Sequence, residues 1–267
     1  MRSQATASAG LEGRDRGISP VISTVIISGT MLIILAVASF VSMNVLELQL
    51  ASTEFEQAKS NMLLLDEVIH DVAMRRGSGG YVQFNQRSGG IGVQERDEAL
   101  VISAGPAGNV TEIYSAQRLL SIVYRGGSLA TGSEMSLRGS GSLIVNVSSM
   151  LSHVRVEYDG GICVKLDYDR VRVIDLGEFI FTGEEGSILH KFIGVSIIRL
   201  SRGPMGGSGT VNLKAQNVGI NTLPVTYPGG SIVLNVRKGL QAESITINSS
   251  ADETVIILTE TVIQVST

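Results

Sequence analysis

Glu67 and His70 are the first residues whose types and spacing suggest chemistry. They lie three positions apart in the segment 66–71, DEVIHD, a separation at which a helix offers a carboxylate and an imidazole to one metal ion. Such a site needs a second copy of the motif and further glutamates, and the sequence contains neither. We therefore expect residues 66–71 to form a solvated helix face and no metal site.

The segment 99–109, ALVISAGPAGN, suggests a phosphate-binding turn after a strand. The dinucleotide fingerprint requires three glycines at fixed offsets, but Ser103 takes the first position and leaves only Gly105 and Gly108. The first glycine makes the tight turn into the phosphate-binding helix, so its loss removes the physical purpose of the motif. We expect a hairpin loop here and no cofactor.

The remaining titratable residues do not form a catalytic pattern. His153 and His190 lie in strand-like segments without a neighbouring cysteine or carboxylate cluster. Asp167, Asp169 and Asp175 are spaced as residues of an exposed sheet face, which does not suit an acid–base pair. Neither a Gly-x-Ser-x-Gly elbow nor a Walker-type loop occurs. We expect no enzyme activity and no catalytic residues.

Composition excludes further classes of protein. Of the 267 residues, 43% are hydrophobic and 17% charged, too apolar for a disordered chain. The 21 basic residues against 25 acidic ones leave no surplus for phosphates, so we expect no nucleic-acid partner. The single cysteine, Cys163, excludes an internal disulfide, and we expect it to be a small buried apolar residue.

The apolar residues are concentrated near the amino terminus. Thirty consecutive residues, from Gly17 to Leu46, carry no charge. About 20 apolar residues cross a bilayer as a helix, so this run predicts a transmembrane helix at about residues 20–46, with the lipid bilayer as a partner.

Flanking charges orient this helix. Arg2, Arg14 and Arg16 precede it, and Glu47, Glu54 and Glu56 follow it. Basic residues stay on the cytoplasmic side, so the carboxyl-terminal part should lie outside the cell, anchored by the helix. A cleaved secretory signal, with Ala36 and Ala38 at the cleavage site, is an alternative, although the apolar run is long and continues beyond these residues.

After Leu46 the apolar residues follow a heptad pattern in two columns. The columns are Leu48, Phe55, Met62 and Ile69, and Ala51, Ala58, Leu65 and Val72. No glycine or proline interrupts residues 30–76, so we predict one helix over 18–76 that ends at Gly77, a residue that tolerates a left-handed cap. Two roles for these helix-packing residues remain open: they pack on the chain's own domain, or between copies of the helix.

Glycine is concentrated after residue 76, where 27 of the 31 glycines lie. This change in composition marks a domain over 77–267, which is one sandwich or two lobes. Its clearest hairpin joins 153–158 to 162–174 through Asp159-Gly160, and strand patterns recur at 231–236, 243–248 and 254–265. We predict an α+β chain, with a long helix followed by a Gly-rich, antiparallel, sandwich-like β domain.

Three Asn-x-Ser/Thr triplets lie in this part of the chain. They begin at Asn109, Asn146 and Asn248, which are candidate glycosylation sites on an outward-facing domain.

The residues 14–22, RDRGISPVI, resemble the class III signal peptide of type IV pilin-like proteins, and RGISPVI is similar to the archaeal pilin amino-terminal domain. The resemblance covers roughly residues 14–46. It implies a prepilin peptidase that removes residues 1–17 as a charged leader. The residues involved in processing would be Arg14, Asp15, Arg16, Gly17 and Ile18. Ile22 stands where bacterial pilins carry glutamate, which archaeal-type members often lack.

The resemblance implies a structural subunit of an archaeal type IV pilus-like filament on the cell surface, inserted in the membrane before assembly. Its partners would be other pilin subunits in a homo-oligomeric filament, as a repeating or minor component. Cell adhesion, surface sensing, motility and DNA uptake remain open as roles. The alternative is a monomeric membrane-anchored surface protein whose β domain binds a ligand, glycan or partner.

Overall fold

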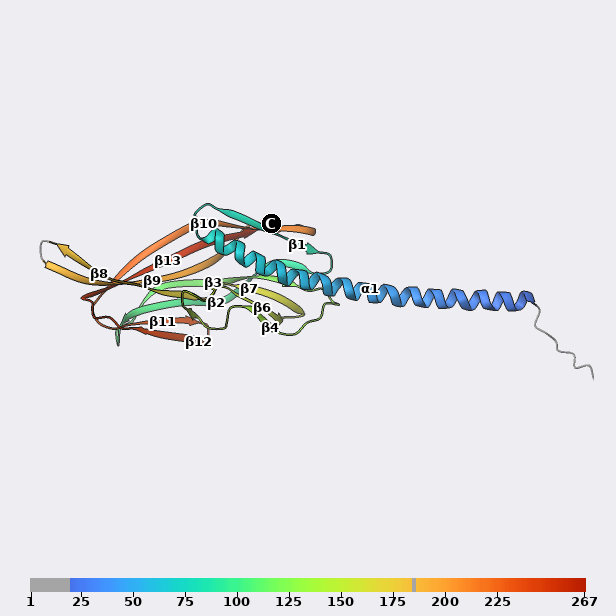
Figure 1. Cartoon of the computed structure of the whole chain (residues 1–267), viewed down its shortest axis with the longest axis horizontal. Coiled ribbons are helices and arrows are strands. Elements are labelled where there is room, and N and C mark those ends of the chain that lie inside the picture. Colours follow the sequence, from blue (N-terminus) through green and yellow to red (C-terminus); the bar gives the residue numbers. More distant parts are fainter. Residues whose placement is uncertain (1–19, 184–185) are drawn as a thin grey trace, which may run out of the picture. The chain divides into compact units, whose positions relative to one another are not determined.

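The structure is a computed structural model that describes residues 20–183 and 186–267 (Figure 1). The chain divides into two compact units, Met1–Glu47 and Leu48–Thr267. One long apolar helix, α1 (Pro20–Ala73), is followed by strands that form two β-sheets, so the predicted α+β class is confirmed. The unit boundary falls inside the helix, well before the change in glycine content at residue 77.

Helix α1 ends at Ala73, three residues before the predicted end at Arg76. Its last carbonyl groups bind side chains from outside the helix. Asn217 Nδ2 donates to the carbonyl oxygens of Val72 and Ala73, and Ser78 Oγ also donates to Val72. Gly77 has φ of +79°, the left-handed conformation expected of it.

The strands that follow the helix fill the rest of the described chain. They are β1 (Gly79–Gln86), β2 (Gly90–Pro106), β3 (Thr111–Arg125), β4 (Met135–Arg138), β5 (Ile144–Val145), β6 (His153–Tyr158), β7 (Ile162–Asp167), β8 (Val171–Gly183), β9 (Gly186–Arg202), β10 (Gly209–Pro228), β11 (Ile232–Lys238), β12 (Gln241–Ile247) and β13 (Glu253–Ser266). Sheet A has the order β1-β10-β13-β9-β8-β5, and sheet B the order β12-β11-β2-β3-β7-β6-β4.

The predicted Asp-Gly hairpin is present as β6 and β7, which pair antiparallel, with Gly160 at φ of +69°. The predicted strand 162–174 is two strands in different sheets. β7 ends at Asp167 in sheet B and β8 begins at Val171 in sheet A. The crossing residues 168–170 are buried between the sheets.

Most neighbouring strands pair antiparallel, as predicted, but two pairs are parallel. β13 lies parallel to β9 along most of both strands, and β5 pairs parallel with the start of β8. Beyond Arg172, β8 has no further partner on that side among the described strands, so it is largely an edge of sheet A.

The core of the β domain has two parts. In one, the inner faces of the two sheets pack directly, with Ile102 and Leu234 opposite Val195 and Ile256. In the other, the second half of α1 lies between the sheets, with β1, β10 and β13 on one side and β3, β6 and β7 on the other (Figure 1). A sandwich in which a helix fills one end therefore organises the domain.

Candidate functional site

The first half of α1 exposes an apolar surface with no partner in the described chain. Between Val21 and Leu46 its large apolar side chains are between 47% and 70% exposed. By length and composition α1 is the one described helix able to cross a membrane, with a mean hydropathy of 2.5 in its most apolar stretch. These properties fit a membrane anchor and a signal sequence alike. Water is a poor solvent for such a surface, so lipid or protein must cover it.

The second half of α1 is buried in the β domain. Seven of the eight heptad residues lie in the core there, and the eighth, Leu48, is 48% exposed. The buried seven are Ala51, Phe55, Ala58, Met62, Leu65, Ile69 and Val72. This part of the stripe packs on the chain's own domain.

Glu54 joins the helix to the β1–β2 turn. Its carboxylate accepts hydrogen bonds from the backbone N–H groups of Arg87, Ser88 and Gly89, from Ser88 Oγ at 2.6 Å and from Tyr124 Oη at 2.8 Å. Desolvation would raise the pKa of the Glu54 carboxyl group, but the hydrogen bonds from Ser88, Tyr124 and Gly89 lower it below its usual value. A Cβ atom at Gly89 would lie 2.5 Å from Tyr124 Oη, so this contact requires glycine.

Asp66 makes the second polar attachment of the helix. Tyr168 Oη donates to Asp66 Oδ1 at 2.6 Å, and Arg138 donates to both Asp66 and Glu67 at 2.9 Å. The expectation of a solvated face was wrong for Asp66, which is 3% exposed, because tyrosine and arginine side chains from the β domain compensate its burial. Burial, followed by the nearby Asp66 carboxylate, raises the pKa of Tyr168 well above its usual value.

Glu67 and His70 line a small cavity of about 80 Å³ together with Asp66 and Arg138. Arg138 engages both carboxylates, so neither is free to bind a cation. Within residues 20–183 and 186–267, no group of three or more His, Cys, Asp or Glu side chains is placed to hold a metal ion.

The glycine-containing segment 99–109 is the end of β2 and its turn into β3, the hairpin loop that we predicted. Ser103 pairs with Glu112 across the two strands. Gly105 and Gly108 have positive φ within this hairpin, and a strand follows them where a phosphate site would need a helix.

The expectation of an exposed aspartate face was wrong for Asp167 and Asp169, which are 2% and 3% exposed. Asp167 pairs with Arg155 at 2.5 Å, and Asp169 pairs with Arg96 and with Lys238. Cations from other strands make burial of both carboxylates possible. Burial and then Asp167 raise the pKa of Asp169, while the two cations oppose this shift. Asp175 is exposed and pairs with Lys191.

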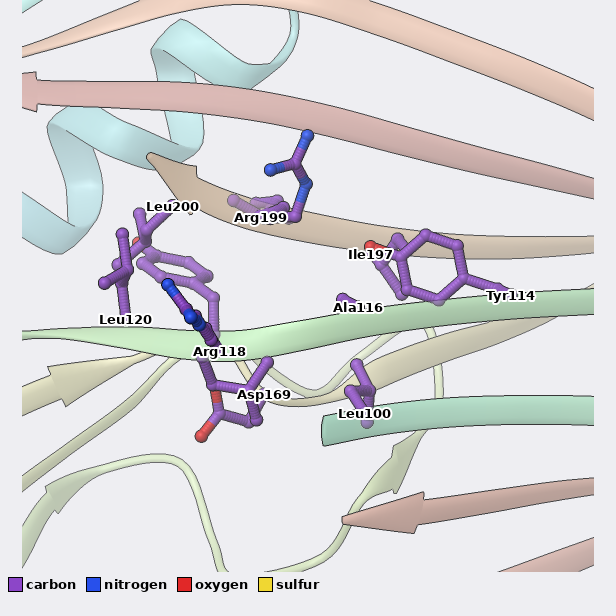
Figure 2. Close-up of a pocket in the computed structure, with 12 residues that line it drawn as sticks. Leu100, Tyr114, Ala116, Arg118, Leu120, Asp169, Ile197, Arg199 and Leu200 are labelled. Atoms are coloured by element: carbon purple, nitrogen blue, oxygen red, sulfur yellow. The ribbon is translucent and has the colours of Figure 1, made fainter. Parts of the chain in front are cut away.

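A small cavity lies beside Asp169, where the two parts of the core meet (Figure 2). Its volume is about 20 Å³, room for about one water molecule and too small for an organic ligand. Arg118, which also lines it, has φ of +61° and is the one described non-glycine residue with positive φ. The cavity is therefore a packing feature at the β2–β3 bulge.

An apolar hairpin formed by β8 and β9 is a surface that sequence reasoning missed. Phe179 and Phe192 lie 5.7 Å apart between ring centroids, and Phe181 lies 5.0 Å from His190. Phe179, Phe181 and the neighbouring Ile188 are between 44% and 53% exposed. Three of the chain's six phenylalanines thus gather on one hairpin, and the run Phe179-Ile-Phe181 was the available signal.

The remaining candidate residues have simpler environments. Cys163 is buried, as expected, and its Sγ contacts the Glu157 carbonyl oxygen. Asn109, Asn146 and Asn248 are all exposed, in or beside turns. The processing residues, Arg14 to Ile18, lie outside the described residues.

Compared with protein-family models, with curated proteins and with solved structures, the chain matches none. The described chain has a long apolar amino-terminal helix followed by a β domain. This architecture is consistent with that of pilin-like proteins.

Proposed function

We propose that the chain is a structural subunit of an archaeal type IV pilus-like filament and has no enzymatic activity. One observation carries the proposal: α1 has an exposed apolar half and a second half that is part of the core of the β domain. A subunit that first waits in lipid and then assembles needs such a surface, because neighbouring helices can replace lipid around it.

The exposed half also contains small residues that favour close helix packing. Ser28, Gly29 and Ser39 lie among large aliphatic side chains, and a Cβ at Gly29 would meet nothing within 4 Å in the described chain apart from the neighbouring helix backbone. Small residues allow helix backbones to approach one another in lipid or in a filament. The resemblance of residues 14–22 to a class III signal adds a route into the membrane and a peptidase partner.

The mature amino terminus tests this function. Processing by a prepilin peptidase predicts a chain that begins at Ile18, and Gly17→Leu should leave the leader attached. A mature chain that begins at Ser39, after the Ala36–Ala38 signal site, or at Met1 contradicts the proposal.

A monomeric anchored surface protein is the second candidate, and the exposed β8–β9 hairpin favours it because nothing in residues 20–183 and 186–267 covers that surface. Fluorescent labelling of the β domain on intact cells separates the two. Fibres labelled along their length support the filament, whereas diffuse surface staining supports the anchored protein.

A further inference from the structure

The hairpin end of sheet A is both apolar and acidic. Phe179, Phe181 and Ile188 expose about half of their surfaces there. Four carboxylates lie at this end of sheet A, against a single lysine, Lys191. Asp175 and Glu178 pair with Lys191 on the opposite face of the hairpin from the phenylalanines, and Glu253 contacts His190 on the same face as the phenylalanines. The carboxylates are Asp175, Glu178, Asp252 and Glu253, and strand pairing places Phe179 opposite His190 and His190 opposite Glu253. We call this surface the acidic hairpin patch.

The other end of sheet A is basic. Arg75, Arg76, Arg202 and Lys214 are exposed, and none makes an ion pair within 4.0 Å in the part of the chain that the structure describes. Tyr81, which is 65% exposed, lies opposite Lys214 in the pairing of β1 with β10. Met74, which is 64% exposed, precedes the two arginines.

Backbone contacts hold these basic residues near one another. Arg202 lies opposite Val265, and Val265 lies opposite Ala215 in the strand pairing. Lys214, the residue before Ala215, lies at the same end of the sheet on its other face. The turn after α1 is joined to β10, the strand that contains Lys214, because Gly77 N donates to the carbonyl oxygen of Asn217. We call Met74, Arg75, Arg76, Tyr81, Arg202 and Lys214 the basic patch.

The two patches cannot meet within one molecule. Strand β9 carries Ile188 near one end and Arg202 at the other, about 45 Å apart at roughly 3.3 Å per residue. Two complementary surfaces at opposite ends of one sheet produce a head-to-tail contact that repeats from copy to copy, and it forms an open filament when the rotation between copies does not close into a ring.

We propose that the acidic hairpin patch of one copy binds the basic patch of the next copy. This inference rests on the proposed filament and names a contact between its outer domains. Carboxylates would pair with the free cations, and the phenylalanine rings offer faces to Arg75 and Arg76. A second copy fits the hairpin better than a bilayer, because the four carboxylates disfavour anionic headgroups.

Cysteine cross-linking in the full-length chain, in intact cells, tests the contact. The double variant Tyr81→Cys/Ile188→Cys should give a ladder of disulfide-linked oligomers on a non-reducing gel, whereas each single variant should stay monomeric. Both positions are exposed, so the two substitutions should not disturb folding. The native Cys163 is 1% exposed, so it should form few cross-links between copies. A ladder abolished by a reductant supports the proposal.

Other outcomes overturn it. A dimer from Ile188→Cys alone means that two hairpins pair with each other. A second outcome is that the double variant gives no ladder while Ser39→Cys still cross-links neighbouring helices. That result overturns the contact between outer domains but remains compatible with the filament. No cross-link at either place, with a mature chain that does not begin at Ile18, overturns both.

A charge reversal tests whether the cross-link depends on the charges of the two patches. Arg75→Glu/Arg76→Glu, added to the cysteine pair, should lower the cross-linked fraction about tenfold, since like charges would face each other. Glu178→Lys/Asp252→Lys in the same chain should restore it. Arg237→Glu, which changes an exposed arginine on β11 in sheet B, is the control and should have no effect. Equal losses in the control and the test variant contradict the proposal.

Discussion

The hydroxyl group of Tyr168 donates a hydrogen bond of 2.6 Å to the carboxylate of Asp66, inside the protein. Tyr168 lies in the crossing between β7 and β8, and Asp66 lies on α1. Both side chains are buried, so neither has water as a substitute partner. The hydrogen bond therefore couples the position of α1 to that of the segment that crosses from β7 to β8.

Replacing Tyr168 by Phe should lower the free energy of unfolding by about 1.5–3 kcal/mol, because a buried carboxylate loses one of its donors. Thermal unfolding of the full chain in detergent, followed by circular dichroism, measures this loss. Tyr158→Phe is the matched control, since Tyr158 is 59% exposed and should change stability by less than about 0.5 kcal/mol. Equal effects of the two variants would contradict the role of Asp66.

Leu65 and Leu64 are adjacent on α1 and differ only in environment. Leu65 is fully buried among the helix and both sheets, whereas Leu64 is 49% exposed. Leu65→Ala should cost about 3 kcal/mol of stability, and Leu64→Ala less than about 1 kcal/mol. Denaturant unfolding of both variants measures the difference. A large loss from Leu64→Ala alone would mean that the buried face of the helix is misassigned.

Glu54 should make stability depend on acid. Its pKa is lower in the folded chain than in the unfolded one, so the unfolded state binds the proton more readily. The stabilisation is complete above the unfolded pKa, near 4.5, and is lost as the pH falls through the folded value. The difference in Tm between the natural chain and Glu54→Gln should therefore be largest at neutral pH and shrink in acid. Glu56→Gln, at an exposed neighbour, should show no such trend.

The domain needs the helix that precedes it. A chain of residues 48–267 should fold, with a β-rich circular dichroism spectrum and a cooperative transition, because it keeps the seven buried heptad residues. A chain of residues 77–267 should not fold cooperatively, since the sheets would face an empty core at one end. Cooperative folding of the shorter chain would contradict this view of the core.

Arg118 holds a backbone conformation that favours glycine, with φ of +61°. Its side chain is 74% exposed, and its contact with Glu95 is a surface ion pair of 3.5 Å, worth little. Arg118→Gly should stabilise the chain by about 0.5–1 kcal/mol, because the strain of a left-handed residue with a side chain exceeds the entropy cost of glycine. Arg118→Ala keeps the strain and should leave Tm unchanged. A fall in Tm with glycine would contradict this reading.

Local patterns in the sequence were enough to predict several elements. The 30-residue charge-free run and the heptad columns predict α1, because helix formation and its apolar face depend on residues three or four apart. The Asp159-Gly160 turn predicts the β6–β7 hairpin for a similar reason, since both strands lie next to each other in the chain.

Pairings between distant segments were not accessible in this way. The burial of Asp66, Asp167 and Asp169 depends on Arg138, Arg155 and Arg96, and two of these three pairs span about seventy residues of chain. The parallel pairing of β9 with β13 and the gathering of phenylalanines at the β8–β9 hairpin likewise arise only when the sheets form.

By itself, the sequence determined that the chain has a long apolar helix followed by a β-rich carboxyl-terminal part. Hydrophobic periodicity and turn residues act over a few positions, so these features can be read from neighbouring residues. Only the tertiary structure decided that half of the helix is the core of the β domain, that three aspartates are buried beside cations, and that opposite charges collect at the two ends of one sheet. Those outcomes depend on long-range packing, which brings together residues that have no regular spacing in the chain.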